Sequence, residues 1–490
     1  MRHLLPVPLA LALWTSVLLP QIPQQEHAQR RAALMRDLDN GALVAFGARE
    51  PVHDYETFTQ SSSFLYLTGI REPDAALVMI KRGSSVTGTI FVAPKDPARE
   101  VWSGIRLGVE QARRHTGLNA RPTQELRQVL DSLGRAGTPL SVVGSFGTQG
   151  ALTLDGQLLA SLRQRWPRLE IEDVTSRVEQ LRAHKSAAEL ALLRRAIDIT
   201  VAAQREAMGA LEPGMNEFEL QALIEYTFRR NGADRPGFAT IVGSGPNSTI
   251  LHYNANDRFT TPGDVVVMDI GASYRGYTAD VTRTIPVSGT FTPEQRAIYQ
   301  IVRDAQAAAE RQLRVGAPAQ AMDDSAQAVM AAGLARLGLI ESPDATYDCP
   351  GAQQTGCPQL RLFYLHGLGH GIGLDVHDPA RYYYEPQRIQ PGDAFTIEPG
   401  IYVRENLLDI LPDTPRNRAL IERIRPAVVR YKNIGVRIED DYFITERGAE
   451  WISRAPREID EVEALMRAPY AGPAARQADV VEDYRRMVEP

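Results

Sequence analysis

Short apolar runs alternate with helical patterns along roughly the first third of the chain. Three of these runs, at residues 41–47, 75–80 and 88–92, have the length and apolar content of buried strands. Segments with helical patterns separate several of the strands. Because such an alternation is typical of an α/β fold, we predict an α/β N-terminal domain over residues 29–176.

The second part of the chain opens on a helix signal. Ser186 and Glu189 are spaced as in a capping box, and the pattern behind them predicts a helix to about residue 211. Further helices and strands are expected at 216–231, 238–243, 264–271, 293–314 and 318–338. We assign residues 177–465 to this second domain and residues 466–490 to a poorly ordered tail.

Two Pro-Gly-Asp turns each precede an apolar strand that ends in an acidic residue. The turn at 262–264 leads to Asp269, and the turn at 391–393 leads to Glu398. An unpaired carboxylate at the end of a buried strand costs several kcal/mol, and a divalent cation would compensate that cost. The repetition suggests two similar halves that each supply metal ligands from a strand.

Five potential metal ligands follow one another along this domain. They are Asp269, Asp280, His370, Glu398 and Glu439. Each acid alone has an ordinary explanation, such as capping a turn or pairing with a neighbouring arginine. Together, four carboxylates and one imidazole make an oxygen-rich set that suits Mn²⁺, or Zn²⁺ in a bimetallic centre. The set predicts a two-metal hydrolase.

His366 and His370 stand four positions apart among glycines. On a helix this spacing would place both on one face, as in zinc proteases, but Gly367, Gly369 and Gly371 make a helix improbable. We therefore expect an extended segment in which one histidine binds metal and others face the substrate. The alternative is that the glycines only ease a tight crossing in the sheet.

Length and charge narrow the class of protein. At 490 residues, with 43% hydrophobic and 7% aromatic content, the chain is long enough for two domains with substantial cores. Its net charge of -6, from 54 basic and 60 acidic residues, gives no electrostatic signature of nucleic acid or of an anionic membrane surface. We expect a small-molecule or peptide partner and no nucleic acid.

Residues 1–28 have the pattern of a secretory signal, with a short charged start and an apolar run from Leu4 to Pro20. The run is short and proline-rich for a membrane span, but no clean cleavage site follows, so an uncleaved anchor stays an alternative. We expect export to the periplasm or the extracellular space. There, the only cysteines, Cys349 and Cys357, should form a local disulfide, with two free thiols as the alternative.

A series of short motifs carries a resemblance that covers nearly the whole chain. The motifs lie at residues 63–69, 100–108, 240–245, 250–253, 269–272, 280–284, 366–370, 374–378, 398–402 and 437–441. They are similar to those of the aminopeptidase P and prolidase group of pita-bread metallopeptidases, and most of all to aminopeptidase P. The resemblance implies an N-terminal α/β domain followed by a C-terminal pita-bread catalytic domain.

The resemblance also assigns roles to the five ligands. It implies that Asp269 chelates one metal ion, that Asp280 and Glu439 bridge both ions, and that His370 and Glu398 complete the other site. Glu398 would also accept a proton from the metal-activated water that attacks the peptide bond.

Other side chains would meet the substrate. The resemblance implies that His252 and His377 hydrogen-bond the substrate carbonyl or the tetrahedral intermediate. It implies that His366 and Arg437 line the site and hold proline or neighbouring acids, and that Tyr402 and His366 are walls of the proline pocket. Because the imide nitrogen of an Xaa-Pro bond carries no N–H, recognition needs a pocket shaped for the pyrrolidine ring.

Trp102 bears on the oligomeric state. It matches a family tryptophan that reaches a neighbouring subunit's active site, which implies a homo-oligomer, either a dimer or a tetramer; the alternative is an ordinary core aromatic. Two loops, one holding Cys349 and Cys357 and one at 404–432, are longer than in compact cytosolic members of the family. They could screen the cleft or alter oligomer contacts.

The implied activity is that of an exported dinuclear aminopeptidase acting on peptides with proline at the second position. Mn²⁺ is the expected metal, with Zn²⁺ or Co²⁺ as alternatives. A prolidase restricted to dipeptides is the close competitor. A non-catalytic pita-bread binding module and a metal-free creatinase-like hydrolase are disfavoured because all five ligands are present.

Overall fold

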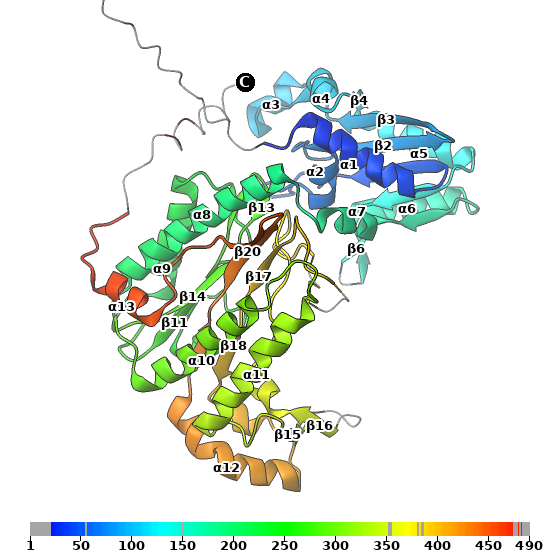
Figure 1. Ribbon diagram of the computed structural model, residues 1–490. Helices are drawn as coiled ribbons and strands as arrows, with labels where there is room; N and C mark the ends of the chain where they lie inside the picture. The colour runs from blue at the N-terminus through cyan, green and yellow to red at the C-terminus, as the bar shows by residue number, and fades with distance from the viewer. Residues whose placement is uncertain are drawn as a thin grey trace, which may run out of the picture.

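The computed structural model describes residues 21–473, apart from 54–55, 149, 351–354, 380–381 and 384–386, and also residues 479 and 482. Two domains follow each other along the chain (Figure 1). Residues 1–20 of the predicted signal and most of the predicted tail lie outside the described residues.

A six-stranded sheet forms the centre of the N-terminal domain, in the order β4-β3-β2-β1-β5-β8. Its strands are β1 (Gly41–Phe46), β2 (Ala76–Arg82), β3 (Ser85–Val92), β4 (Asn119–Pro122), β5 (Leu140–Val143) and β8 (Ile171–Asp173). The pairs β1–β2 and β2–β3 are antiparallel, and the other pairs are parallel. The three predicted strands are β1, β2 and β3, and the predicted α/β class is confirmed.

Strand β1 is buried on both faces because its side chains alternate between two cores. Ala42, Val44 and Phe46 pack in one core with leucines of α5 and α6, whereas Leu43 and Ala45 belong to the core that continues into the second domain. A strand covered on both faces needs apolar residues at every position, which explains the unbroken apolar run in the sequence.

Helices cover both faces of this sheet. They are α1 (Gln24–Asp37), α2 (Ser62–Thr68), α4 (Gly108–Thr116), α5 (Leu126–Arg135), α6 (Leu154–Arg165) and α7 (Thr175–Arg182). The short helix α3 (Pro97–Ser103) buries none of its residues, and β6 (Gly147–Thr148) and β7 (Ala151–Leu152) form a small hairpin. In α1, His27 is buried and bonded to the Tyr66 carbonyl at 2.9 Å, so the last part of the predicted signal segment, from Gln24, lies in a packed helix. Helix α7 spans the predicted junction at 176/177 and packs against α1, α2 and β5.

The second domain begins with α8 (Ala187–Ala210), which starts at the predicted capping box. Ser186 Oγ accepts from the Glu189 amide at 3.2 Å, and the Glu189 carboxylate accepts from the Ser186 amide at 2.9 Å. The other helices are α9 (Glu217–Arg230), α10 (Pro293–Glu310), α11 (Gln320–Leu337), α12 (Pro415–Tyr431) and α13 (Ile459–Arg467). The predicted helices of this domain are therefore confirmed.

Short antiparallel sheets form the inner layer of this domain, with helices outside them (Figure 1). The strands are β9 (Arg235–Pro236), β10 (Ile241–Ser244), β11 (Val265–Ile270), β12 (Ala272–Tyr274), β13 (Tyr277–Thr278), β14 (Val281–Pro286), β17 (Ala394–Ile397), β18 (Gly400–Val403), β19 (Ile434–Arg437), β20 (Asp440–Thr445) and β21 (Gly448–Trp451). Helix α8 packs on β11 to β14, and α10 packs on β17 to β19. Each predicted Pro-Gly-Asp turn does lead into a strand, β11 or β17.

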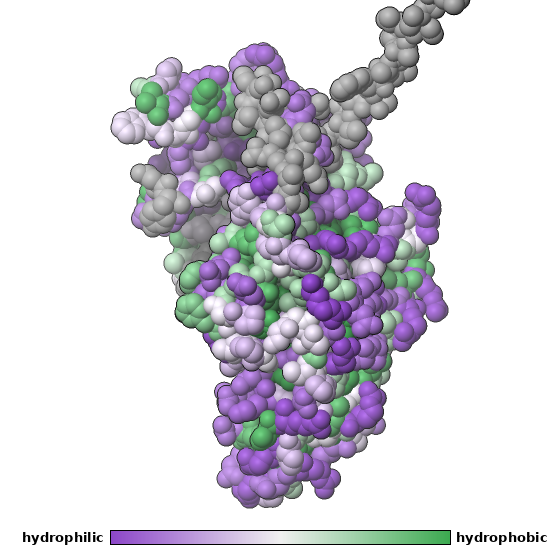
Figure 2. All heavy atoms as spheres, turned by 90° about the vertical axis from the view of Figure 1, so that its left-hand side faces the viewer, coloured by the Kyte–Doolittle hydropathy of each residue, from purple (hydrophilic) through white to green (hydrophobic). Residues whose placement is uncertain are grey.

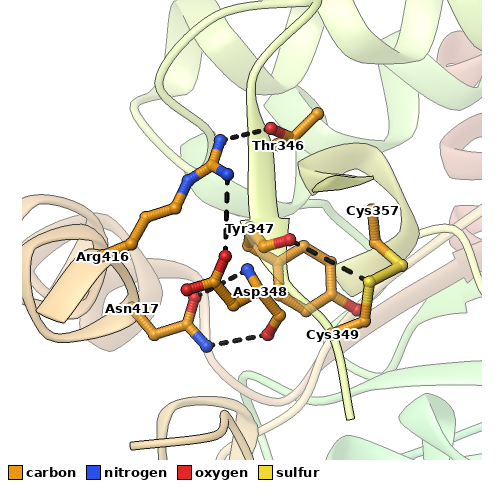
Figure 3. Close-up of a disulfide and its surroundings, with 7 residues drawn as sticks. All are labelled: Thr346, Tyr347, Asp348, Cys349, Cys357, Arg416 and Asn417. Carbon is orange, nitrogen blue, oxygen red and sulfur yellow. Dashed lines mark hydrogen bonds and ion pairs between the residues drawn. A yellow bond between two sulfur atoms is a disulfide. The ribbon is translucent and has the colours of Figure 1, made fainter. Parts of the chain in front are cut away.

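The two longer loops fold into one unit at the end of the molecule that carries α12 (Figures 1 and 3). The first loop forms a hairpin of β15 (Thr346–Asp348) and β16 (Thr355–Pro358), closed by a disulfide between Cys349 and Cys357 with a Cα to Cα distance of 5.8 Å. Asn417 in α12 accepts from the Asp348 amide at 3.0 Å and donates to the Asp348 carbonyl at 2.8 Å. The predicted disulfide is confirmed.

No helix among the described residues is both long and apolar enough to cross a membrane. The face shown in Figure 2 mixes hydrophilic and hydrophobic residues over both domains.

Candidate active site

The five predicted ligands converge on one cavity of about 480 Å³ in the second domain. Asp269 lies in β11, Asp280 precedes β14, His370 precedes β17, Glu398 joins β17 to β18, and Glu439 joins β19 to β20. Residues far apart in the sequence thus meet through strand pairing.

Strand register explains the convergence. Asp269 pairs with Thr282 across β11 and β14, which brings Asp280 to the same end of that sheet. Ile397 pairs with Asp440 across β17 and β20, so Glu398 and Glu439 leave their strands at neighbouring positions. Each Pro-Gly-Asp turn thus leads into a strand, β11 or β17, whose end places a candidate ligand at the cavity.

His370 stands between the carboxylates. Its Nε2 atom is 3.4 Å from Asp280 Oδ2 and 3.5 Å from Glu398 Oε1. Ligand atoms of Asp280, His370 and Glu439 lie within 4.8 Å of one another. Because His370 Nδ1 donates to the Gly371 carbonyl at 3.1 Å, Nε2 keeps the lone pair that a metal ion requires.

Several of the buried acidic side chains have a carboxylate oxygen that makes no hydrogen bond among the described residues. Within the described part of the chain, Asp269 Oδ1, Asp280 Oδ1 and Glu439 Oε1 lack a hydrogen-bond partner. Burial, and then the neighbouring carboxylates, raise the pKa of Asp280 and of Glu398 well above the usual range and that of Glu439 to about 8. These carboxylates repel one another and have oxygens without partners, and a neutral imidazole stands beside them. Such a set of donors is suited to binding divalent cations.

Three predicted substrate-binding residues form a hydrogen-bonded chain beside the ligands. Arg437 Nη2 donates to Asp269 Oδ2 at 2.6 Å, and Arg437 Nη1 donates to the Tyr402 hydroxyl at 2.7 Å. His366 Nδ1 donates to the Gly367 carbonyl, so its Nε2 accepts from that hydroxyl at 2.8 Å. Burial, and then Arg437, lower the pKa of His366 to about 3, which keeps this imidazole neutral.

His252 and His377 also line the cavity, as predicted, and both are exposed to solvent. The His377 ring lies 4.1 Å from the His370 ring. The cavity removes part of the His377 ring from water, and this desolvation, followed by the nearby His252, lowers the pKa of His377. An imidazole N–H that lines the cavity can donate to a substrate oxygen on which negative charge develops.

Trp102 lies elsewhere. It sits on α3 with 90% of its surface exposed and is not among the described residues that line the cavity. The core-aromatic alternative is therefore wrong. Val101 and Ile105 beside it are 81% and 83% exposed.

Several residues of the site were not predicted from the sequence. Thr282 Oγ1 donates to Glu439 Oε2 at 2.6 Å and orients that ligand, while Asp441 Oδ2 accepts from the Asp280 amide at 3.3 Å. Both residues lie inside sequence motifs, at 280–284 and 437–441, two positions from a predicted ligand. That position was the one sequence feature that could have marked them. The apolar wall includes Phe238, Ile241, Leu251 and Val376. The last three lie inside the sequence motifs, whereas Phe238 lies outside them.

Comparison with known proteins decides the family. A model of metallopeptidase family M24 matches residues 191–446, more than half of the chain, and a model of the aminopeptidase P N-terminal domain matches residues 27–140. This chain belongs to the aminopeptidase P branch of metallopeptidase family M24. The resemblance, the fold class and the enzyme class predicted from the motifs are confirmed.

Curated relatives of this M24 chain match it over nearly their full length. It is 35% identical over 453 residues to an Xaa-Pro aminopeptidase of Haemophilus influenzae, covering 91% of this chain and 98% of the relative. It is 34% identical over 467 residues to the Xaa-Pro aminopeptidase of Escherichia coli, with the same coverage.

Solved structures agree with the sequence relatives. A variant of Escherichia coli aminopeptidase P in complex with substrate superimposes on the M24 chain with a TM-score of 0.76 at 33% identity, covering 91% of this chain and 98% of that one. Proline aminopeptidase P II of Yersinia pestis gives a TM-score of 0.76 at 32% identity, covering 91% and 99%. Both domains of this chain therefore have counterparts in known aminopeptidase P structures.

Proposed function

We propose that this chain is a dinuclear Xaa-Pro aminopeptidase that releases an N-terminal residue from peptides with proline at the second position. The observation that carries the proposal is the meeting of four carboxylates and His370 Nε2 in one cavity, next to the chain from Arg437 through Tyr402 to His366. Relatives named Xaa-Pro aminopeptidase, matched over 91% of this chain, support it.

The carboxylates and the imidazole that line the cavity support the proposed set of metal ligands. Asp269, Asp280, His370, Glu398 and Glu439 would hold two divalent cations. When bound, the cations supply a water of lowered pKa and polarise the scissile carbonyl. The oxygen-rich ligands favour Mn²⁺, with Zn²⁺ or Co²⁺ as substitutes, because several metals bind such sites and availability selects among them.

The protein's own groups handle protons and substrate. Glu398, which lines the cavity, would accept the proton of the attacking water. His252 and His377 donate to the carbonyl oxygen as negative charge develops on it. His366 lines the cavity and forms the wall against which the proline ring packs. Tyr402, which was predicted to line the site, is fully buried and is not among the described lining residues. Its hydroxyl holds the His366 imidazole and is itself held by Arg437.

We further propose that the protein is exported and forms a homo-oligomer, a dimer or a tetramer. The signal-like pattern of residues 1–20 and the disulfide between Cys349 and Cys357 support export, because disulfides persist in oxidising compartments. The exposed patch of Val101, Trp102 and Ile105 supports self-association, since a monomer seldom leaves such side chains open to water. Light scattering on the purified protein measures the oligomeric state.

Two substrates test the catalytic proposal. The metal-free, Mn²⁺ and Zn²⁺ forms are each assayed with Ala-Pro-Ala and with Ala-Pro. We expect release of alanine from the tripeptide, with the highest rate in the Mn²⁺ form. Cleavage of the dipeptide alone would instead assign the protein as a prolidase, and no cleavage with any metal would contradict both.

A further inference from the structure

His377 stands on a loop whose two ends are joined by backbone hydrogen bonds. The Gly371 amide donates to the Pro379 carbonyl at 2.8 Å, and the Asp378 amide donates to the Gly371 carbonyl at 2.7 Å, so residues 371–379 form a closed loop. Among the described residues, the exposed His377 side chain makes a ring contact with His370 but no hydrogen bond. The position of its imidazole therefore depends on how the loop backbone is held.

Two carboxylates flank His377, and Arg182 binds both. Arg182 lies at the end of α7, and only 3% of its side chain is exposed. Its Nη2 atom is 2.9 Å from Asp378 Oδ2 and also contacts Asp375 Oδ2, while Nε donates to Asp378 Oδ2 at 3.1 Å. A planar guanidinium that binds the residues on either side of His377 fixes the loop in orientation as well as in distance.

Three further side chains, Ser62, Ser63 and Lys185, hold the His377 loop and Arg182 in place. From α2, Ser62 Oγ donates to Asp375 Oδ1 at 2.6 Å, and Ser63 Oγ accepts from Arg182 Nη1 at 3.3 Å. The buried Lys185 donates from Nζ to the Asp378 carbonyl. The Ile372 amide and the Gly373 carbonyl anchor one end of the loop on β17 and β13, whereas α2, α7 and the segment that follows α7 hold the part around His377.

A glycine in the loop, Gly373, makes room for the Asp378 carboxylate. A Cβ atom at Gly373 would lie 2.3 Å from Asp378 Oδ2 and 3.0 Å from Cε of Lys185. Only glycine at this position lets the Asp378 carboxylate turn inward, where it also accepts from the Leu374 amide at 3.1 Å.

We propose that Arg182 is a positioning residue for His377, through which the N-terminal domain and its junction set the catalytic geometry of the second domain. The inference rests on the proposed function, in which His377 stabilises the substrate oxygen. Lysine can replace the charge of Arg182 but not its two-sided contact. A shift of the loop would misplace the imidazole while leaving the proposed metal ligands, which all lie outside residues 371–379, in place.

The test compares kinetics of Arg182→Lys with those of the wild type on Ala-Pro-Ala in the Mn²⁺ form. We expect kcat to fall about tenfold or more, because small misplacements of a reacting group are costly, with KM and metal content nearly unchanged. Arg177→Lys is the matched control, since Arg177 lies on the same helix, is 39% exposed and pairs with Glu172 at the surface. It should behave like the wild type.

A double-variant cycle separates positioning from general destabilisation. In a His377→Ala background, Arg182→Lys should lower kcat by less than about twofold, because the group that it positions is gone. An equal loss of kcat in both backgrounds, or none in either, would overturn the inference. If Arg182→Lys folds poorly, Asp375→Asn takes its place in the double-variant cycle with His377→Ala. Asp375 is the exposed partner of Arg182, so its replacement weakens the same contact.

Chemical modification gives a readout without turnover. Diethylpyrocarbonate labelling of His377, followed by mass spectrometry, should be severalfold faster in Arg182→Lys than in the wild type, since a released loop frees the imidazole from His370. An unchanged rate would contradict the positioning role. A wild type that cleaves no Xaa-Pro peptide would contradict the proposed function instead, and labelling would still decide the role of Arg182.

Discussion

Arg437 donates from Nη2 to Oδ2 of Asp269 at 2.6 Å, and both side chains are almost fully buried. The contact joins the proposed metal ligand in β11 to the end of β19, two residues before the proposed ligand Glu439. It occupies one oxygen of Asp269 and leaves Oδ1 without a partner among the described residues, so the arginine turns the carboxylate toward the cavity.

Replacement of Arg437 by lysine should impair the site although the charge is kept. Lysine cannot bind Asp269, Tyr402 and Thr282 together, as Arg437 does through Nη2, Nη1 and Nε. We expect kcat/KM on Ala-Pro-Ala to fall by about 100-fold. Arg430→Lys is the control, because Arg430 is 61% exposed and pairs with Glu294 at the surface. Wild-type kinetics for Arg437→Lys would argue against this role.

Glu398→Ala should remove both a ligand and the proton acceptor. The expected loss of kcat is roughly 1000-fold or more, with fewer metal ions bound per chain as measured by elemental analysis of the dialysed protein. Glu405→Ala serves as the comparison, since Glu405 is 60% exposed and pairs with Lys432. Unchanged activity of Glu398→Ala would exclude Glu398 from the site.

Metal removal should make the stability of the protein depend on pH. Burial, and then Asp269, raise the pKa of Glu439 from 4.5 to about 8, and the pKa values of Asp280 and Glu398 are raised in the same direction. The folded state then holds these protons more tightly than the unfolded state, so the stability they contribute is complete below the ordinary pKa and is lost as pH rises through the folded pKa.

We therefore expect the Tm of chelator-treated protein to fall between about pH 5 and pH 8. The Mn²⁺ form should show a smaller fall, because bound cations compensate the ionised carboxylates. Differential scanning fluorimetry across this range measures both. A Tm of the metal-free protein that rises with pH would contradict the expectation.

Loss of the disulfide should lower stability more than activity. Cys349 and Cys357 close a loop with a sequence separation of 8, for which chain entropy predicts a loss of about 2–3 kcal/mol on replacing both by serine. Because the hairpin packs on α12 and not in the cavity, kcat/KM should change little. Urea unfolding with and without reductant provides the check, since reductant should lower the wild-type midpoint but not that of the double variant. A large loss of activity at full stability would show that the hairpin shapes the site.

The elements that could be predicted from the sequence are those whose signals are local. The capping box of Ser186 and Glu189, the apolar run of β1 and the two Pro-Gly-Asp turns each depend on residues close together in the chain. The five ligands were recognisable because a carboxylate after an apolar strand is costly unless a partner or a cation compensates it. The disulfide was predictable because only two cysteines exist.

Relationships between distant segments required the tertiary structure. The contact of Arg437 with Asp269 spans 168 positions, and that of Arg182 with Asp378 spans 196. Neither residue pair has a local pattern, because a buried arginine and an exposed one look alike in sequence. The exposure of Trp102 was likewise open until the fold placed α3 at the surface. Sequence by itself determined which groups can bind metal, since that depends on residue type; packing decided which side chains hold those groups in place, since that depends on strand register and on the junction between the domains.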